Sequence, residues 1–260
     1  IYPLQDSGTL LTGYLHPYFE EMPHRKTRPC VVNVPAGLIN TAPTGKQDPI
    51  AEAYFCKRLP GICPLLQYHR KGNGASGNRF YAIMRAFRKR GTYRGSTRKN
   101  MGVDPAKIAV CGFSAGGHLA ASLGVHWNSE KLRALCPVEG RQNRPDAMIL
   151  SYPVISAQKE VHPEWHDSFS ALLGPERHRR RKKPIFHWKT RWTKNTVPAF
   201  CWHTMDDDCV CVTNTMRFVK SLYEHGVPAD ATFSSMGITA CPCAPRRWEM
   251  TIPMWRIGLN

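Results

Sequence analysis

The segment that is best suited to catalysis is Gly112-Phe113-Ser114-Ala115-Gly116, in which a serine lies between two glycines. Glycines at this spacing let the chain turn sharply, so the central serine can be held in a strained conformation between a strand and a helix. Its hydroxyl would then stand at a helix N-terminus, where free N–H groups and the helix dipole favour an anion. The pattern predicts a nucleophilic serine, and the alternative is a glycine-rich turn without chemistry.

The elements around this turn have the order that such a serine requires. Residues 107–112 form a short apolar run typical of a buried strand, and residues 115–127 have the composition of a helix rich in small side chains. Further strands are predicted at residues 9–15, 29–34, 145–152, 197–203 and 229–233, and further helices at 48–57, 168–173 and 212–225. Strands that alternate with helices indicate an α/β fold with a mostly parallel sheet covered on both faces. We expect one domain over residues 1–260.

The segment Val-Cys-Gly-Phe-Ser-Ala-Gly-Gly-His-Leu-Ala-Ala-Ser-Leu-Gly at 110–124 resembles the nucleophile elbow of α/β-hydrolase-fold serine esterases and lipases. It is most similar to the bacterial acetylxylan-esterase-like and BD-FAE-type group. The resemblance extends over 101–175 and 195–234, covers 9–57 in part, and fails over 61–100, 176–194 and 236–260. It implies an α/β-hydrolase three-layer sandwich and a carboxylic-ester hydrolase that forms an acyl-enzyme. Short acyl or acetyl esters, among them esters of carbohydrates, are the implied substrates, and no cofactor is implied.

The same resemblance implies roles for particular residues. Ser114 matches the nucleophile, and Asp207, four positions after His203, matches the acid that orients the base. The neighbours Asp206 and Asp208 leave an ordinary acidic loop as the alternative. The oxyanion hole would use the N–H of Ala115 with the loop at Ala36 and Gly37, where the glycine run of the family is only partly present. Cys211 occupies a position at which the family usually has proline.

The histidine of the triad is missing from its expected place. The family turn after the last strand would put it near position 238, which is Ile238, and no histidine follows His225. His225 belongs to the helix before that strand. One choice of codons for residues 236–243 encodes Gly-His-His-Gly-Leu-Ser-Leu when it is read from the third base. The chain is therefore either altered by reading-frame slips in its unmatched segments or a diverged pseudo-hydrolase.

The charge distribution raises a competing hypothesis. The formal net charge is +17, yet residues 69–100 and 177–194 hold ten and nine Lys or Arg and no acidic residue. The remaining positions carry 17 basic and 19 acidic side chains. The basic runs at 88–90 and 179–183, with nearby aromatic residues, could contact nucleic acid. No nucleic-acid-binding module is visible and the rest of the chain is slightly acidic, so we expect no nucleic-acid partner.

The remaining cysteine, glycine and histidine motifs do not indicate a metal or cofactor site. The ten cysteines include two C-x-C pairs, at 209–211 and 241–243, and not the C-x-x-C spacing of zinc ribbons, so we expect reduced thiols and no metal. The glycines at 72–77 lack a preceding strand, and the histidines at 162–166 are interrupted by proline. No signal sequence and no membrane-spanning apolar run are visible, which predicts a cytoplasmic protein without a membrane partner. The oligomeric state is left open.

Overall fold

A computed structural model describes residues 2–4, 9–14, 28–34, 65–70, 103–135, 140–141, 143–156 and 194–235 of the chain. The strands are β1 (Tyr2–Leu4), β2 (Thr9–Tyr14), β3 (Arg28–Val34), β4 (Leu65–Arg70), β5 (Val103–Phe113), β6 (Ala147–Ser151), β7 (Ala199–Thr204) and β8 (Ala229–Ser234). The helices are α4 (Ala115–His126), α5 (Glu130–Leu135) and α8 (Thr213–Glu224). The helices predicted at 48–57 and 168–173 lie outside the described residues.

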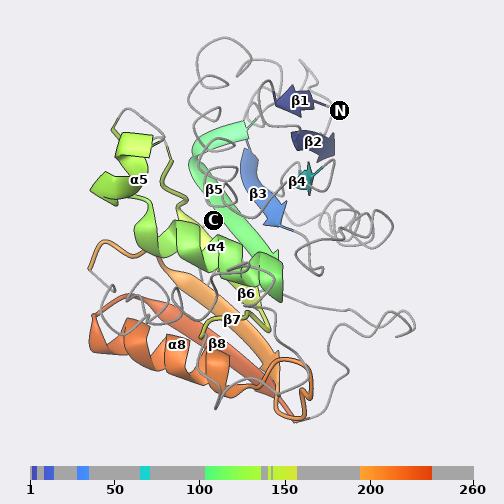
Figure 1. Ribbon diagram of the computed structural model, residues 1–260, viewed down its shortest axis with the longest axis vertical. Coiled ribbons are helices and arrows are strands. Elements are labelled where there is room, and N and C mark those ends of the chain that lie inside the picture. Colours follow the sequence, from blue (N-terminus) through green and yellow to red (C-terminus); the bar gives the residue numbers. More distant parts are fainter. Residues whose placement is uncertain are drawn as a thin grey trace, which may run out of the picture.

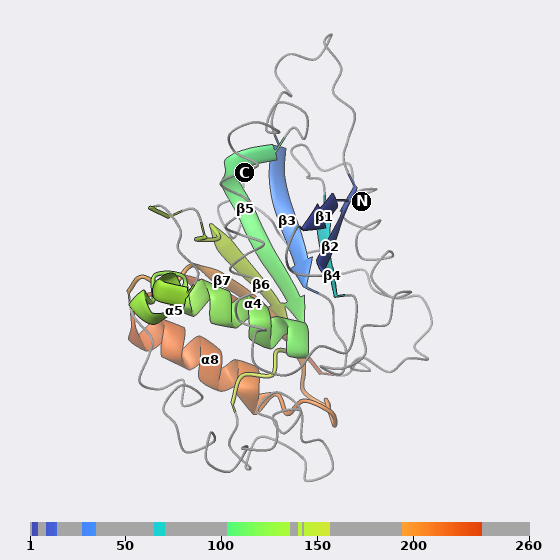
Figure 2. The same ribbon diagram turned by 45° about the horizontal axis from the view of Figure 1, so that its top comes forward.

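The described strands form one sheet in the order β1-β2-β4-β3-β5-β6-β7-β8. The pairs from β4 through β3, β5, β6 and β7 to β8 are all parallel, whereas β1 with β2 and β2 with β4 are antiparallel. The α/β class with a mostly parallel sheet is thus confirmed. Helices α4, α5 and α8 lie on the same face of the sheet (Figures 1 and 2).

The core between α4 and the sheet explains why that helix consists of small residues. Alternate residues of β5 and β6, such as Val110 and Met148, face the helix and are fully buried. A Cβ at Gly124 would lie 2.7 Å from the sulfur of Met148 and 3.0 Å from a methyl group of Val197. The helix therefore rests directly on the strands, because small side chains let the two backbones approach closely.

Helix α8 covers β7 and β8 with one apolar stripe. Phe218 and Leu222 are fully buried in the core that also contains Cys201 of β7. Gly226, with a φ of 66°, ends the helix. Its N–H donates to Tyr223 O at 3.0 Å, and such a left-handed residue closes the last helical turn at least cost when it is glycine.

The predicted strands and helices are confirmed wherever they fall on described residues, but the structure also contains three elements that the sequence does not predict, namely β1, β4 and α5. Residues 65–70 form β4, which the sequence does not predict because it has no clean alternation of apolar residues. Residues 104–105, an Asp-Pro pair of a kind that predicts a turn, lie inside β5. They occupy an irregularity in which the register with β3 shifts between Arg28 and Cys30, and Ala106 N–H donates to Asp104 Oδ1 at 2.9 Å.

Within the described part of the chain, no helix has the length and apolar character needed to cross a membrane.

Candidate active site

Ser114 occupies a strained turn between the end of β5 and the start of α4. Its φ of 51° and ψ of −118° lie outside the regions that non-glycine residues normally adopt. The glycine at 112 makes the turn possible, since a Cβ there would lie 2.8 Å from the Cβ of Ala120 and closer still to the carbonyl oxygen of Gly116. Likewise, a Cβ at Gly117 would lie 2.8 Å from that of Pro153.

Backbone hydrogen bonds tie the turn to the end of β6. The N–H of Ser114 donates to Ser151 O at 3.1 Å, and its carbonyl accepts from the N–H groups of His118 and Val154 at 3.1 and 3.2 Å. The side chain makes no capping hydrogen bond to α4. Ser114 is half-buried, and its backbone is held on both sides.

Of the three residues predicted for the oxyanion hole, the structure describes only Ala115. Ala115 is the first residue of α4, so its N–H belongs to the first turn of the helix, whose N–H groups have no partner within the helix. This position suits a donor to a negatively charged oxygen. Ala36 and Gly37 lie outside the described residues.

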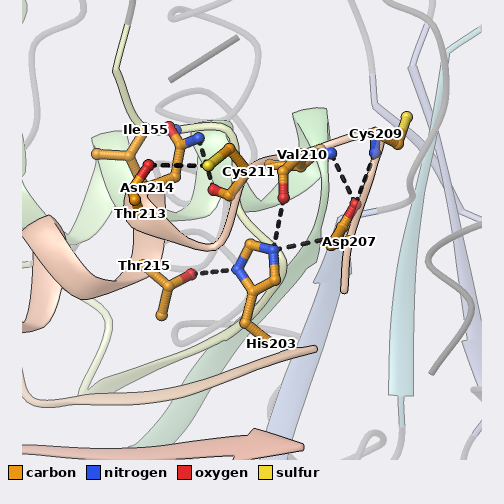
Figure 3. Close-up of polar contacts among 9 residues, drawn as sticks. All are labelled: Ile155, His203, Asp207, Cys209, Val210, Cys211, Thr213, Asn214 and Thr215. Carbon is orange, nitrogen blue, oxygen red and sulfur yellow. Dashed lines mark hydrogen bonds and ion pairs between the residues drawn. The ribbon is translucent and has the colours of Figure 1, made fainter. Parts of the chain in front are cut away.

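Asp207 lies in the loop between β7 and α8, and its side chain is fully buried. Its Oδ1 accepts hydrogen bonds from the N–H groups of Cys209 and Val210 at 2.9 and 2.7 Å (Figure 3). Its Oδ2 lies 3.1 Å from His203 Nε2. Hydrogen bonds of this kind stabilise the charged form of a carboxylate. By contrast, Asp206 and Asp208 are exposed.

The sheet register brings Ser114 and Asp207 to the same edge. Phe113, the last residue of β5, pairs with Ser151 of β6, which in turn pairs with Trp202 of β7. Because these three strands are parallel, their carboxyl ends meet at one edge, where α/β folds bind their ligands. Ser114 and Asp207 follow the two strands that flank β6, and the end of β8 reaches the same edge through the pair of Thr204 with Ser234.

Tyr152 is a residue of this edge that sequence reasoning missed. It follows β6 directly, has a φ of 37°, and is 5% exposed. Its ring packs against Phe113, Trp202 and His203, with ring centroids 6.1, 6.2 and 6.5 Å away. Burial, and then the negative charge of Asp207, raises the pKa of its phenol, which therefore stays protonated. A positive φ at a non-glycine residue is a signal that only the structure provides.

The structure gives the nearby histidines other partners. Nδ1 of His118 lies 2.8 Å from the carbonyl oxygen of Val154, and Nδ1 of His225 lies 2.8 Å from that of Ser221 at the end of α8. His203 is buried against Asp207. Position 238, where the family histidine is expected, lies outside the described residues. The described residues contain no group of three or more His, Cys, Asp or Glu side chains arranged to hold a metal ion.

The loop that carries Asp207 is also joined to the segment that follows β6. Asn214 Oδ1 accepts from the N–H groups of Ile155 and Ser156 at 3.1 and 2.9 Å, and its Nδ2 donates to Cys211 O at 3.0 Å. Cys211 Sγ lies 3.0 Å from Thr213 Oγ1. Fully buried Asn214 thereby connects the loop of Asp207 with the segment that also holds the carbonyl of Ser114.

A mostly parallel sheet with a strained serine after β5 and a buried aspartate after β7 is the arrangement of an α/β hydrolase, and solved structures agree. The acetyl ester-xyloside bifunctional hydrolase from Caldicellulosiruptor lactoaceticus superposes with a TM-score of 0.68 at 27% identity, over 92% of this chain and 82% of that one. The carboxylesterase Cest-2923 from Lactobacillus plantarum WCFS1 gives 0.70 at 19% identity, over 88% and 79%. The α/β hydrolase MGS-M1, from a Medee basin deep-sea metagenome library, gives 0.62 at 22% identity, over 90% and 79%.

Sequence comparison identifies the family within this class. The BD-FAE family profile matches residues 77–222, and the chain belongs to the BD-FAE family. Endo-1,4-beta-xylanase B of Butyrivibrio fibrisolvens is 35% identical over 128 residues, which are 48% of this chain and 19% of that protein. The chain thus spans about a fifth of the length of the curated relative that it matches.

Proposed function

We propose that the chain is a serine carboxylic-ester hydrolase that acts through an acyl-enzyme. The observation that carries the proposal is the strained Ser114, held at the same sheet edge as the buried Asp207. Ser114 Oγ would attack the ester carbonyl and a general base would take its proton, leaving the substrate oxygen negatively charged. The N–H of Ala115, with the loop at Ala36 and Gly37, would stabilise that charge.

Short acyl esters, in particular acetyl groups on carbohydrates, are the proposed substrates. Support comes from the names of two similar proteins, an acetyl ester-xyloside bifunctional hydrolase and an endo-1,4-beta-xylanase. The class of reaction itself needs no metal ion or organic cofactor, because the serine supplies the nucleophile and the backbone supplies the oxyanion donors.

The general base decides the rate that we expect. With Ile238 at the position of the family histidine, Asp207 has no imidazole to orient at that place. Loss of one member of a serine triad costs roughly four to six orders of magnitude in kcat. We therefore propose that this chain hydrolyses acetate esters close to the background rate. Hydrolysis at an ordinary enzymatic rate would overturn the assignment of the missing base.

A gain-of-function variant tests the whole proposal. Residues 236–242 are replaced by Gly-His-His-Gly-Leu-Ser-Leu, and hydrolysis of 4-nitrophenyl acetate and of acetylated xylan is followed. We expect the rate to rise by at least about a thousandfold, since a positioned general base restores most of the triad's contribution. In the same background Ser114→Ala should remove the gain. Ser129→Ala, beyond the opposite end of α4, serves as the matched control and should keep it.

The nucleotide sequence across codons 234–243 separates the two explanations of the missing histidine. A plausible single-base slip there would favour a displaced reading frame and an active ancestor. A sequence that reads through without one would favour a diverged pseudo-hydrolase that keeps the fold and the serine.

A further inference from the structure

We infer that His203 is a positioning residue that fixes the orientation of the Asp207 carboxylate, through hydrogen bonds that run from Thr215 to the imidazole and on to the carboxylate. The inference rests on the proposed function only in treating Asp207 as the catalytic acid. Its evidence is the geometry around the imidazole, which involves neither the missing base nor turnover.

Both nitrogens of the imidazole are engaged. Nε2 lies 3.1 Å from Asp207 Oδ2 and 2.8 Å from the carbonyl oxygen of Val210, and Nδ1 lies 2.7 Å from Thr215 Oγ1 (Figure 3). A carboxylate and a carbonyl only accept hydrogen bonds, so Nε2 must carry the hydrogen. The Thr215 hydroxyl, which can donate or accept, suits Nδ1 in either protonation state. The ring is therefore held from both sides in one tautomer.

The imidazole joins rigid elements to a loop. His203 lies near the end of β7 and Thr215 in the first turn of α8, whereas Asp207 and Val210 belong to the loop between these elements. His203 and Thr215 are fully buried. Hydrogen bonds in such a dry site are stronger than in water, and an unpaired polar group there is costly. The loop thus takes its position from the strand and the helix.

The oxygen that His203 contacts is the one that matters for catalysis. Each carboxylate oxygen has two lone pairs, and the N–H groups of Cys209 and Val210 use both on Asp207 Oδ1. We therefore expect a catalytic base to donate to Oδ2. Because His203 Nε2 donates to Oδ2, it sets the direction in which the other lone pair of that oxygen points.

Two substitutions separate this role from simple filling of the core. In His203→Gln the side-chain amide can place an N–H near the position of Nε2, so the donor to Asp207 is retained. In His203→Asn the amide reaches only the position of Nδ1, so contact with Thr215 is retained and the donor to Asp207 is lost. A purely structural histidine would make both substitutions comparably harmful.

The test is an NMR measurement on the full chain. The nitrogen-15 signals of His203 report which ring nitrogen carries hydrogen, and we expect Nε2–H in the unaltered chain. Hydrogen exchange of the Cys209 and Val210 amides reports how firmly the carboxylate is held. In His203→Asn we expect these two amides to exchange about tenfold faster relative to Ile149 in the centre of β6, and in His203→Gln at close to the unaltered ratio. His225→Asn is the control and should leave that ratio unchanged.

Each outcome of this experiment either supports or overturns the positioning role of His203. Equal effects of the Asn and Gln substitutions, or a loss of protection no greater than that of Ile149, would overturn the inference, as would an unaltered His203 protonated only on Nδ1. If neither variant folds, Thr215→Val, which preserves the side-chain shape, should speed exchange at Cys209 and Val210 and not at Ile149. Unchanged exchange there would refute the relay. The esterase proposal fails separately, in the Ser114→Ala rate comparison.

Discussion

At the scale of single residues, Ser114 shows how the fold stores strain at the position proposed for the nucleophile. A φ of 51° at a serine costs about 1–3 kcal/mol and persists only because neighbouring contacts fix it. Those contacts are the hydrogen bonds of its N–H and carbonyl to the end of β6 and the first turn of α4. The strain keeps the hydroxyl at the sheet edge, where a substrate carbonyl would arrive.

The strain predicts an unusual order of stabilities. Ser114→Gly should unfold with a free energy about 1 kcal/mol higher than that of Ser114→Ala, because glycine tolerates the conformation and alanine keeps the strained Cβ. The measurement is urea denaturation of the two variants under identical conditions. If alanine proved as stable as glycine, the positive φ would not be a source of strain.

The close approach at Gly112 predicts a second difference between matched substitutions. Gly112→Ala should lower the free energy of unfolding by about 3 kcal/mol or more, because the new methyl group meets backbone atoms of Gly116 that cannot move away. Gly124→Ala should cost less, since the nearest atom is the sulfur of Met148, at the end of a flexible side chain, and alanine favours the helix by about 1 kcal/mol. Urea denaturation compares the pair, and equal losses would contradict the explanation.

At the scale of elements, Ser114 and the loop of Asp207 share a polar connection that runs through the segment after β6. The carbonyl of Ser114 accepts from Val154, and the next two N–H groups of that segment donate to Asn214, which also holds Cys211 of the acid loop. The turn after β5 and the loop after β7 are thus linked through the segment after β6. This link holds Ser114 and Asp207 in place without any contribution from a residue at position 238.

Asn214→Leu tests the connection. Leucine has a similar size but leaves the N–H groups of Ile155 and Ser156 without their acceptor, at a cost of about 2–4 kcal/mol in the free energy of unfolding. Asn128→Leu, in the turn after α4, is the matched control and should change it by about 0.5 kcal/mol or less. Equal stability of the two variants in urea would show that Asn214 does not hold these elements together.

At the scale of the whole molecule, buried acidic groups make stability fall at alkaline pH. Burial raises the pKa of the Cys201 thiol from 9.0 to about 12, and it also raises the pKa of Tyr152. The unfolded chain releases these protons near their ordinary pKa values, whereas the folded chain keeps them. Their contribution is therefore complete below about pH 9 and is lost as the pH rises toward the folded-state values.

Cys201→Ala tests this linkage. Above about pH 9 each such thiol steepens the loss of stability by about 1.4 kcal/mol per pH unit. The variant should be less stable than the unaltered chain at neutral pH, because it leaves a small cavity, but its free energy of unfolding should fall less steeply with rising pH. Urea denaturation between about pH 8 and about pH 10 measures both slopes. Parallel curves would show that Cys201 does not titrate on unfolding.

Local patterns in the sequence determined much of this protein. Apolar runs predicted β3, β5, β6 and β7, and helical spacing predicted α8, because these elements bury apolar side chains. Strand β8 was also predicted, although its residues are exposed or half-buried. The glycines around Ser114 predicted a tight turn, since only glycine fits where backbones meet. Strand β4 escaped prediction, because its residues lack a period and it is defined by pairing with β2 and β3, which are distant in sequence.

The contacts among the site residues were decided by the tertiary structure. The spacing of His203 and Asp207 was visible, but that the imidazole bonds to the carboxylate, and through Thr215 to α8, depends on how the loop folds back. The strained Tyr152 and the bridging Asn214 had no local signal. Their roles arise from the parallel register of β5, β6 and β7, which brings together residues about forty to ninety positions apart in the chain. Sequence periodicity determines which face of a strand is buried, whereas only pairing between strands determines which strand ends become neighbours.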